Sequence, residues 1–420
     1  MNKIKKFFKL LGPGFITGAS DDDPSGIGTY AQTGAQFGYT QLWTAFFSTP
    51  FMSVIQEICG RIGLVTGKGL AGVIRKYYPR SILYCAVLFL VVVNTINIGA
   101  DLGAMASSGQ MLFNIPFIFW LVGMTVLTLV LEIFVSYRVY ARFLKYLTFS
   151  LFAYIIAAFI IKQDWGKIAY STFIPHLSLS KEYVMNLVAI LGTTISPYLF
   201  FWQASEEVEE EVENHKLRAM GQGVPDIGKK DIKKMRADTF AGMFFSNLVM
   251  FFIIVTAAST LHVNGILEIE TATQAAEALR PLAGNGAFLL FAAGIIGTGL
   301  LAVPVLSGAA SYAVAEAFGW KEGLYRKLTQ AHGFYGVITI ATLVGLLVNF
   351  TPIKPFQMLY YTAILNGIIA PPLMVMLMLI SSNKMIMGKY TNSPVISLFG
   401  WFITLVMAGA AILLIVNVIR

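Results

Sequence analysis

Three consecutive aspartates near the start of the chain are the residues best suited to bind an ion. Asp21, Asp22 and Asp23 lie in the apolar stretch GPGFITGASDDDPSGIGTYAQTGAQFG and are followed directly by Pro24. Proline lacks a backbone N–H and breaks a helix, so carbonyl oxygens beside it lose their helical partners. Carboxylate and carbonyl oxygens are the ligands that hard cations prefer. The stretch therefore predicts a cation site.

A second stretch, LVAILGTTISPYLFFWQASEE, is interrupted in a similar way. Pro197 lies near its middle, and the small polar residues Thr193, Thr194 and Ser196 precede it. For Pro197 alone, an ordinary helix kink is an alternative interpretation. Two interrupted helices in corresponding positions of two halves of a membrane protein instead indicate a transport site between the halves.

The elements that position these residues are membrane helices. Of 420 residues, 56% are hydrophobic and only 12% are charged, with a mean hydropathy of +0.70. A soluble domain carries about 25% charged residues. We expect an all-α polytopic membrane protein, one domain over 1–420 with about 11 transmembrane helices, because a span needs about 20 apolar residues. The candidate spans are 12–37, 40–65, 81–106, 116–134, 141–161, 183–207, 236–262, 284–316, 332–350, 355–381 and 395–418.

The three aspartates are costly in such a chain. At the centre of a membrane helix they cost about 8–10 kcal/mol together on the insertion scale, enough to cancel the gain of the whole span. Unwound backbone at membrane depth is tolerated only in protein or along a cavity. Asp21–Asp23 must therefore lie against protein, water or a cation.

The basic residues predict the orientation of the chain. The candidate spans place 23 of the 30 Lys and Arg residues on one side and 6 on the other. The positive-inside rule then puts the N-terminus in the cytoplasm and the C-terminus outside a cell membrane. The net charge of +8 is thus explained by topology, with the lipid bilayer as partner and no nucleic acid.

The two interrupted spans are the first and the sixth. Spans 1–5 and 6–10 have opposite orientations in this topology, because five is odd. We therefore expect two inverted repeats, at about 10–161 and 183–381, followed by an extra helix at 395–418.

At this point the chain resembles a known family. The segments GPGF…DPSG, TTISPY and ADLGA resemble the Nramp divalent-metal transporters, which have the LeuT-type fold with helices 1 and 6 broken. Where the family has Asp-Pro-Gly-Asn in the first helix, Asp23 and Pro24 match. Where it has Met-Pro-His-Asn in the sixth, only Pro197 matches.

The resemblance implies a set of metal ligands. Asp23 would provide a carboxylate, and Ser20 and Thr193 would provide backbone carbonyls. Gly26 replaces the ligating Asn of the family, and Ser196 replaces its thioether Met. Thioethers favour transition metals, whereas hydroxyl, carboxylate, carbonyl and water oxygens suit Mg²⁺. A site without the Met and the Asn is also wider and wetter, which suits an ion that dehydrates reluctantly.

The family's proton-linked groups are also sparse in this chain. Tyr198 and Gln203 stand in place of its sixth-helix histidines, Gly28 in place of its first-helix glutamate, and Ala104 in place of the glutamate that follows Asp101. A proton path needs groups that titrate near neutral pH. The pattern resembles the Nramp-related magnesium transporters, and it predicts transport of Mg²⁺, and also Mn²⁺, without proton coupling.

Other polar residues are candidates for the ion pathway. On the third span, Asp101 and the two asparagines one and two turns before it predict a polar stripe. Glu206 and Glu210 begin an acidic run that indicates either a solvated helix end or a cytoplasmic vestibule that concentrates cations. The further candidates for the pathway or for indirect contact with the ion are Asp22, Asp101, Asn94, Asn97, Tyr198 and Asn366.

Three alternative functions stay open. A proton-coupled Mn²⁺/Fe²⁺ importer would need Asp101 as its proton group. An amino-acid or other organic-solute transporter of the same fold is disfavoured, because the three aspartates would repel a carboxylate. A sensor or scaffold would have only the short loop around 206–236 as its output. We expect no enzymatic activity and no cofactor besides the transported ion; the oligomeric state is left open, with a monomer as one option.

Overall fold

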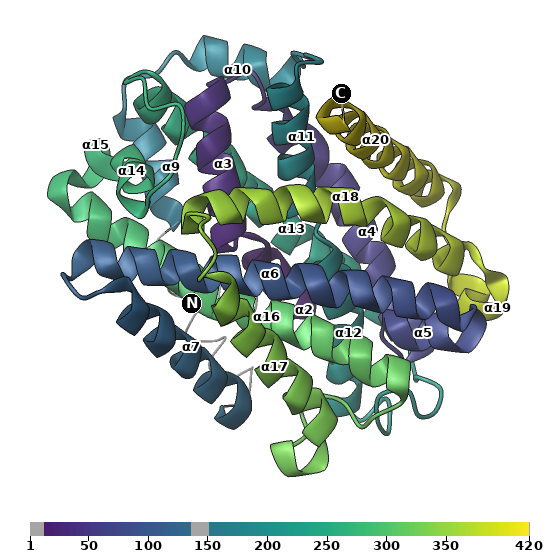
Figure 1. Ribbon diagram of the computed structural model, residues 1–420. Helices are drawn as coiled ribbons and strands as arrows, with labels where there is room; N and C mark the ends of the chain where they lie inside the picture. Colours follow the sequence, from purple (N-terminus) through teal and green to yellow (C-terminus); the bar gives the residue numbers. More distant parts are fainter. Residues whose placement is uncertain (1–11, 136–150, 420) are drawn as a thin grey trace, which may run out of the picture.

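The computed structural model describes residues 12–135 and 151–419, which form a bundle of helices (Figure 1). Within these ranges, β-structure is limited to an isolated bridge between Ala219 and Gln222. The principal helices are α2 (Pro13–Asp21), α3 (Pro24–Phe37), α4 (Trp43–Thr66), α6 (Arg80–Leu112), α7 (Phe117–Phe134), α9 (Phe152–Ile160), α11 (Lys181–Thr194), α12 (Pro197–Glu213), α13 (Lys229–Ala257), α16 (Ala287–Phe318), α17 (His332–Val348), α18 (Pro355–Ser382) and α20 (Pro394–Ile419). Shorter helices connect them: α5 (Leu70–Tyr77), α10 (Trp165–Phe173), η2 (Ala258–His262), α14 (Ala272–Ala276), η3 (Glu277–Leu279), α15 (Arg280–Ala283), η4 (Gly284–Gly286), η5 (Leu328–Gln330), α19 (Lys384–Met387) and η6 (Gly388–Tyr390).

The predicted all-α membrane architecture is confirmed. Each predicted span coincides with one of the principal helices or with a broken pair, although residues 141–150 of the fifth span lie outside the described residues. In the described ranges, seven helical segments are long and apolar enough to cross a membrane, and α17 is a shorter apolar helix. The chain is therefore a multi-pass membrane protein.

Both predicted helix breaks are present, and the first residue after each break is a proline. Pro24 begins α3 and Pro197 begins α12, where each ring fixes the first turn and no backbone N–H is lost to the helix. A proline inside a membrane helix does not always interrupt it. Pro304 lies inside α16, and α16 is nevertheless continuous.

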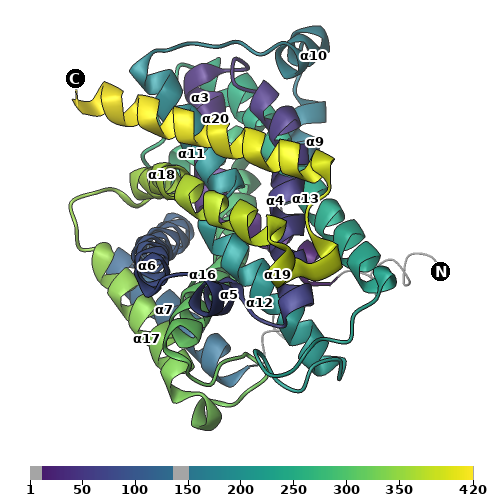
Figure 2. The same cartoon turned by 90° about the vertical axis from the view of Figure 1, so that its right-hand side faces the viewer.

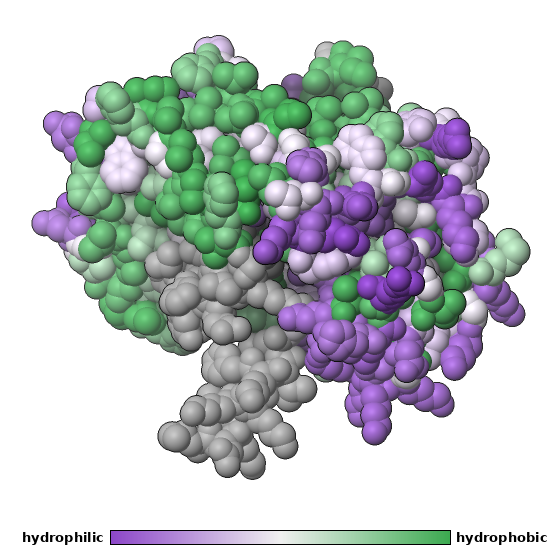
Figure 3. Space-filling view, turned by 90° about the horizontal axis from the view of Figure 1, so that it is seen from below, coloured by the Kyte–Doolittle hydropathy of each residue, from purple (hydrophilic) through white to green (hydrophobic). Residues whose placement is uncertain are grey.

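The broken helices lie in the centre of the bundle and other helices surround them. In the segment from Lys181 to Glu213, 89% of the most apolar stretch is buried, against 28% for α7 and for α20. The two views show α20 on the outside of the bundle (Figures 1 and 2). Seen from below, hydrophobic residues cover a broad area and hydrophilic residues gather at one side (Figure 3). This separation is typical of a lipid-facing surface that borders an aqueous face.

The first half of the broken helix 1, α2, is held tightly against α13. A Cβ on Gly18 would lie 2.3 Å from the carbonyl carbon of Gly242, so the two backbones touch and only glycine fits. At the start of α2, the Asp238 carboxylate accepts backbone N–H bonds from Gly12, Gly14 and Phe15 at 2.9, 2.8 and 3.3 Å. An anion at a helix N-terminus stabilises it. α13 therefore fixes the position of α2, and with it the position of the aspartates.

Candidate metal site

The break in helix 1 fixes the Asp23 carboxylate. Asp23 has extended backbone dihedrals and caps α3, because its Oδ1 accepts the Gly26 N–H at 2.6 Å. Its Oδ2 accepts the Tyr198 hydroxyl of α12 at 3.2 Å. Asp23 is only 1% exposed. A carboxylate held on both oxygens is oriented before any ion arrives.

At the break in the sixth span, between α11 and α12, the Ser196 hydroxyl points back towards the end of α11. Ser196 is the residue before α12, but its side chain does not cap that helix. The hydroxyl instead donates to the carbonyl oxygens of Thr193 and Gly192, at 2.6 and 2.9 Å, at the end of α11. Since the proton of Ser196 points at these carbonyls, the lone pairs of its oxygen stay available to a cation.

The two breaks meet at one place. The Tyr198 hydroxyl lies 3.2 Å from the Ser20 carbonyl as well as from Asp23. At Gly26, the position of a Cβ would be 3.0 Å from the Asp21 carbonyl oxygen and 3.4 Å from both Asp23 Oδ1 and Thr193 Oγ1. The space over Gly26 is thus surrounded by oxygen atoms. The five residues predicted for the metal site lie at four helix ends, and the fold brings them together.

Of the polar residues predicted to line the ion pathway, some lie beside Asp23 and others contact different helices. Asp101 of α6 is buried and interacts electrostatically with Asp23, and Asn97 is buried one turn before it. Asn94, however, donates to the Leu306 carbonyl of α16 at 2.9 Å, so its amide nitrogen ties two helices together. Asn366 of α18 is 1% exposed, and its amide atoms have no hydrogen-bond partner among the described residues.

Asp21 and Asp22 share a partner that the sequence did not indicate. The Ser246 hydroxyl of α13 lies 2.7 Å from Asp21 Oδ2 and 3.3 Å from Asp22 Oδ1. Ser246 is an ordinary small residue in an apolar helix, so no sequence pattern marked it. Tyr198 was predicted only as a candidate for the pathway or for indirect contact with the ion, and the structure adds that its hydroxyl donates to both Asp23 and the Ser20 carbonyl.

The site concentrates four buried acidic side chains. Asp21, Asp22, Asp23 and Asp101 are at most 1% exposed, and in the described ranges none of them forms a salt bridge with Lys or Arg. Buried charges without a counter-charge are strongly destabilising. The described residues also contain no cluster of three or more His, Cys, Asp or Glu side chains arranged to hold a metal. A cation here would therefore combine a carboxylate with hydroxyl, carbonyl and water oxygens.

The acidic run at the end of α12 lies apart from this site. Glu206 is 7% exposed within α12, and Glu210, one turn further on, forms a salt bridge with Lys234 at 2.7 Å. Glu210 lines a pocket between α12 and α13, at the end of α12 remote from Ser196.

Comparison with known sequences identifies the family. The sequence profile of the Nramp (natural resistance-associated macrophage protein-like) family matches residues 14–417. The chain belongs to the Nramp family. Two relatives named divalent metal cation transporter MntH are each 27% identical to it. The one from Caldanaerobacter subterraneus aligns over 95% of this chain and 90% of its own, and the one from Mesorhizobium japonicum over 99% and 88%.

Solved structures agree with this membership. The manganese transporter of Eremococcus coleocola, crystallised with an aromatic bis-isothiourea compound, superposes with a TM-score of 0.75 at 15% identity over 99% of this chain and 88% of its own. Mhp1, a nucleobase-cation-symport-1 family transporter in a closed conformation, gives a TM-score of 0.59 at 13% identity, with coverages of 97% and 91%. At these identities the likeness shows the fold alone. The predicted LeuT-type fold with helices 1 and 6 broken is confirmed for this Nramp family member.

Proposed function

We propose that this chain transports divalent metal cations across the cell membrane, favours Mg²⁺, also carries Mn²⁺, and works without proton coupling. The observation that carries the proposal is the chemistry of the ligand set. Asp23 offers a carboxylate, Ser196 a hydroxyl, and Ser20 and Thr193 carbonyls, so every candidate ligand is an oxygen. Oxygen-only sites that leave room for water suit Mg²⁺.

The closed geometry fits an alternating-access cycle. Asp23, Ser196 and Asp101 are almost fully buried, so the ion site is shielded from both sides in this conformation. Both discontinuous helices contribute ligands, as expected for a transporter that moves one repeat against the other around a central site. The orientation, with the N-terminus in the cytoplasm, and the repeat boundaries given above stay predictions.

The second candidate is proton-coupled Mn²⁺ import. It is supported by the name of the Eremococcus coleocola manganese transporter and by Asp101, a buried carboxylate beside Asp23 that could carry a proton. The two candidates differ in one measurable quantity, the proton flux that accompanies the metal.

Uptake into liposomes tests the proposal directly. The purified protein is reconstituted with a Mg²⁺-sensitive dye and a pH-sensitive dye inside, and the external Mg²⁺ or Mn²⁺ concentration is raised. We expect Mg²⁺ influx with no internal acidification. Mn²⁺ influx with acidification, and no Mg²⁺ influx, would instead establish the proton-coupled candidate. Protein-free liposomes give the leak rate.

Ser196→Met tests which residue sets the ion preference. The substitution adds a thioether beside Asp23, and soft sulfur favours transition metals over Mg²⁺. We expect the ratio of Mg²⁺ to Mn²⁺ uptake rates to fall by about tenfold or more, the range typical of changes around a metal ligand. Ser196→Ala is the matched control, because it loses the same hydroxyl bonds to Thr193 and Gly192 without adding sulfur. Equal ratios in the two variants would show that sulfur at this position does not select the ion.

A further inference from the structure

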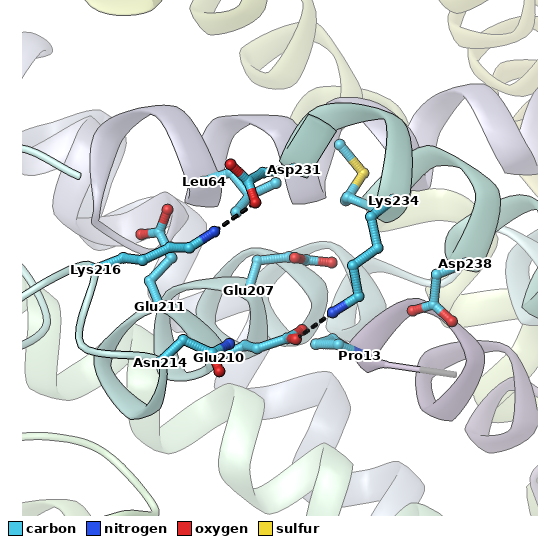
Figure 4. A pocket seen from close by; sticks show the side chains of 11 residues that line it. Pro13, Leu64, Glu207, Glu210, Glu211, Asn214, Lys216, Asp231, Lys234 and Asp238 are labelled. Atoms are coloured by element: carbon cyan, nitrogen blue, oxygen red, sulfur yellow. Dashed lines mark hydrogen bonds and ion pairs between the residues drawn. The ribbon is translucent and has the colours of Figure 1, made fainter. Parts of the chain in front are cut away.

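A second acidic site lies at the end of the bundle predicted to face the cytoplasm. A pocket of about 50 Å³ opens between the last turns of α12, the first turns of α13 and the start of α2 (Figure 4). Its lining includes the five carboxylates of Glu207, Glu210, Glu211, Asp231 and Asp238. Two ammonium groups, from Lys216 and Lys234, face them. The lining therefore has three more acidic than basic side chains.

The two lysines are already paired. Lys234 bonds to Glu210 at 2.7 Å, and Lys216 bonds to Asp231 (Figure 4). Two of the other three carboxylates accept hydrogen bonds from uncharged donors. Glu207 accepts from the Gln203 amide at 2.8 Å, and Asp238 accepts the N–H groups at the start of α2. Neither of these carboxylates has its charge cancelled by a salt bridge in the described part of the chain.

Glu211 is the exception, because its side-chain carboxylate has no hydrogen-bond partner in the described part of the chain. Its side chain lines the pocket and is 2% exposed, yet neither of its oxygens has a hydrogen-bond partner among the described residues. Lys216 acts on it only at longer range, since that ammonium group is bonded to Asp231. A buried carboxylate without a partner is costly, so a positively charged ligand in this pocket would be stabilising.

The geometry points to a hydrated divalent cation as that ligand. The described residues contain no group of three acidic side chains close enough to hold a bare ion. The pocket has room for an ion with part of its water shell, because a single water needs only about 10–15 Å³ of such space. Mg²⁺ keeps several waters and is commonly held by one or two carboxylates. We propose that Glu211, with Glu207 and Asp238, binds a hydrated divalent cation separate from the transport site; the choice of Mg²⁺ as ligand rests on the proposed function.

A cation bound in this pocket would affect the position of α2. Its lining joins α12 and α13 to the start of α2, and Asp238 already holds the N–H groups of Gly12 and Gly14. The far end of α2 carries Ser20 and leads to Asp23. A ligand that binds the closed arrangement better than the open one shifts the population towards the closed state. The bound cation thus stabilises the closed arrangement of α2, α12 and α13. Mg²⁺ that has accumulated on this side therefore slows further release of transported Mg²⁺ to the same side.

The test uses full-length protein in which the transport site is disabled, so its outcome does not depend on whether the wild type carries Mg²⁺. Mg²⁺ is titrated calorimetrically into Asp23→Ala and Asp23→Ala/Glu211→Gln. We expect one remaining site in the first protein, and binding at least about tenfold weaker in the second. Asp23→Ala/Glu268→Gln is the control and should bind like Asp23→Ala, because Glu268 lines a separate pocket with Gln32 and Tyr361. An Asp23→Ala protein that binds no Mg²⁺, or that binds equally with and without Glu211, overturns the proposal.

Hydrogen exchange at the start of α2 provides a second readout. In Asp23→Ala, Mg²⁺ should slow exchange of the amides that bond to Asp238, and it should not do so in the Glu211→Gln double variant. In the same background, Glu211→Lys carries its own positive charge into the pocket. We expect it to slow the exchange without Mg²⁺ and to abolish the response to Mg²⁺. Exchange that is insensitive to both Mg²⁺ and Glu211→Lys would show that the pocket does not hold α2.

Discussion

Asp23→Ala is expected to abolish metal uptake, with initial rates at least about a hundredfold below wild type, because the carboxylate is the one charged ligand in the proposed set. The remaining ligands would be hydroxyl and carbonyl oxygens, which do not replace the lost negative charge. Asp23 also links the two breaks, since it caps α3 and accepts the Tyr198 hydroxyl. The measurement is Mg²⁺ and Mn²⁺ uptake into liposomes at matched protein content.

Asp23→Asn separates the charge from the fold. Asparagine is as good an N-cap as aspartate, so the bond to the Gly26 N–H is preserved while the negative charge is lost. We expect this variant to unfold at the wild-type temperature and to lose uptake like Asp23→Ala. Asp164→Asn is the matched control, because Asp164 caps α10 through the Lys167 N–H away from the site. Wild-type uptake by Asp23→Asn would remove Asp23 from the list of charged ligands.

Arg61→Ala is expected to produce the largest loss of stability. Arg61 is 1% exposed in α4, and its guanidinium bonds to both oxygens of Glu57 at 2.9 and 3.1 Å and to Asn392 at 2.7 Å. It also bonds to the Tyr390 carbonyl, so it joins α4 to the segment before α20. Removal of one partner from a buried ion pair costs about 3–5 kcal/mol when the other charge is left unpaired. Because Arg236 still bonds to one oxygen of Glu57, we expect a loss near the lower end of this range.

The stability change is read as a lower midpoint in thermal unfolding of the detergent-solubilised protein. Arg236 also bonds to Glu57, at 2.7 Å, and its side chain is 48% exposed. Arg236→Ala therefore serves as the matched control: it removes a half-exposed partner of the same carboxylate and should cost much less. Glu57→Gln/Arg61→Met, which removes both buried charges and keeps most of the volume, should recover part of the loss. Equal midpoints for Arg61→Ala and Arg236→Ala would contradict the assignment of Arg61 as the buried anchor.

The positions of the helices could largely be predicted from the sequence, because the bilayer imposes a simple requirement. A span needs about 20 apolar residues whatever its neighbours are, so hydropathy places it without knowledge of packing. The effect of a proline was harder to predict. Pro24 and Pro197 begin new helices, whereas Pro50, Pro304 and Pro371 lie inside continuous ones. Neighbouring helices and local side chains decide whether a membrane helix tolerates the missing N–H.

The candidate site was only partly predictable for a similar reason. A run of three aspartates indicates a cation by its cost alone, and the resemblance to the Nramp family indicated Ser20, Gly26, Thr193 and Ser196. The partners of these residues come from distant parts of the chain and carry no pattern of their own. Ser246 bonds to Asp21 and Asp22 across more than 220 positions, and Asn94 bonds to α16, although its spacing had placed it with Asp101.

The sequence by itself determined that this protein spans a membrane many times, that two of its helices are broken, and that a carboxylate lies at the first break. These properties follow from transfer free energies and backbone chemistry, which depend on residue type and order alone. The tertiary structure decided which oxygens gather over Gly26, that Tyr198 orients Asp23, and that Asp238 holds α2 against α13. It also left the Glu211 carboxylate buried without a hydrogen-bond partner among the residues described. Such pairings depend on how closely helices approach and on which atoms then face one another, and only the packed chain sets those distances.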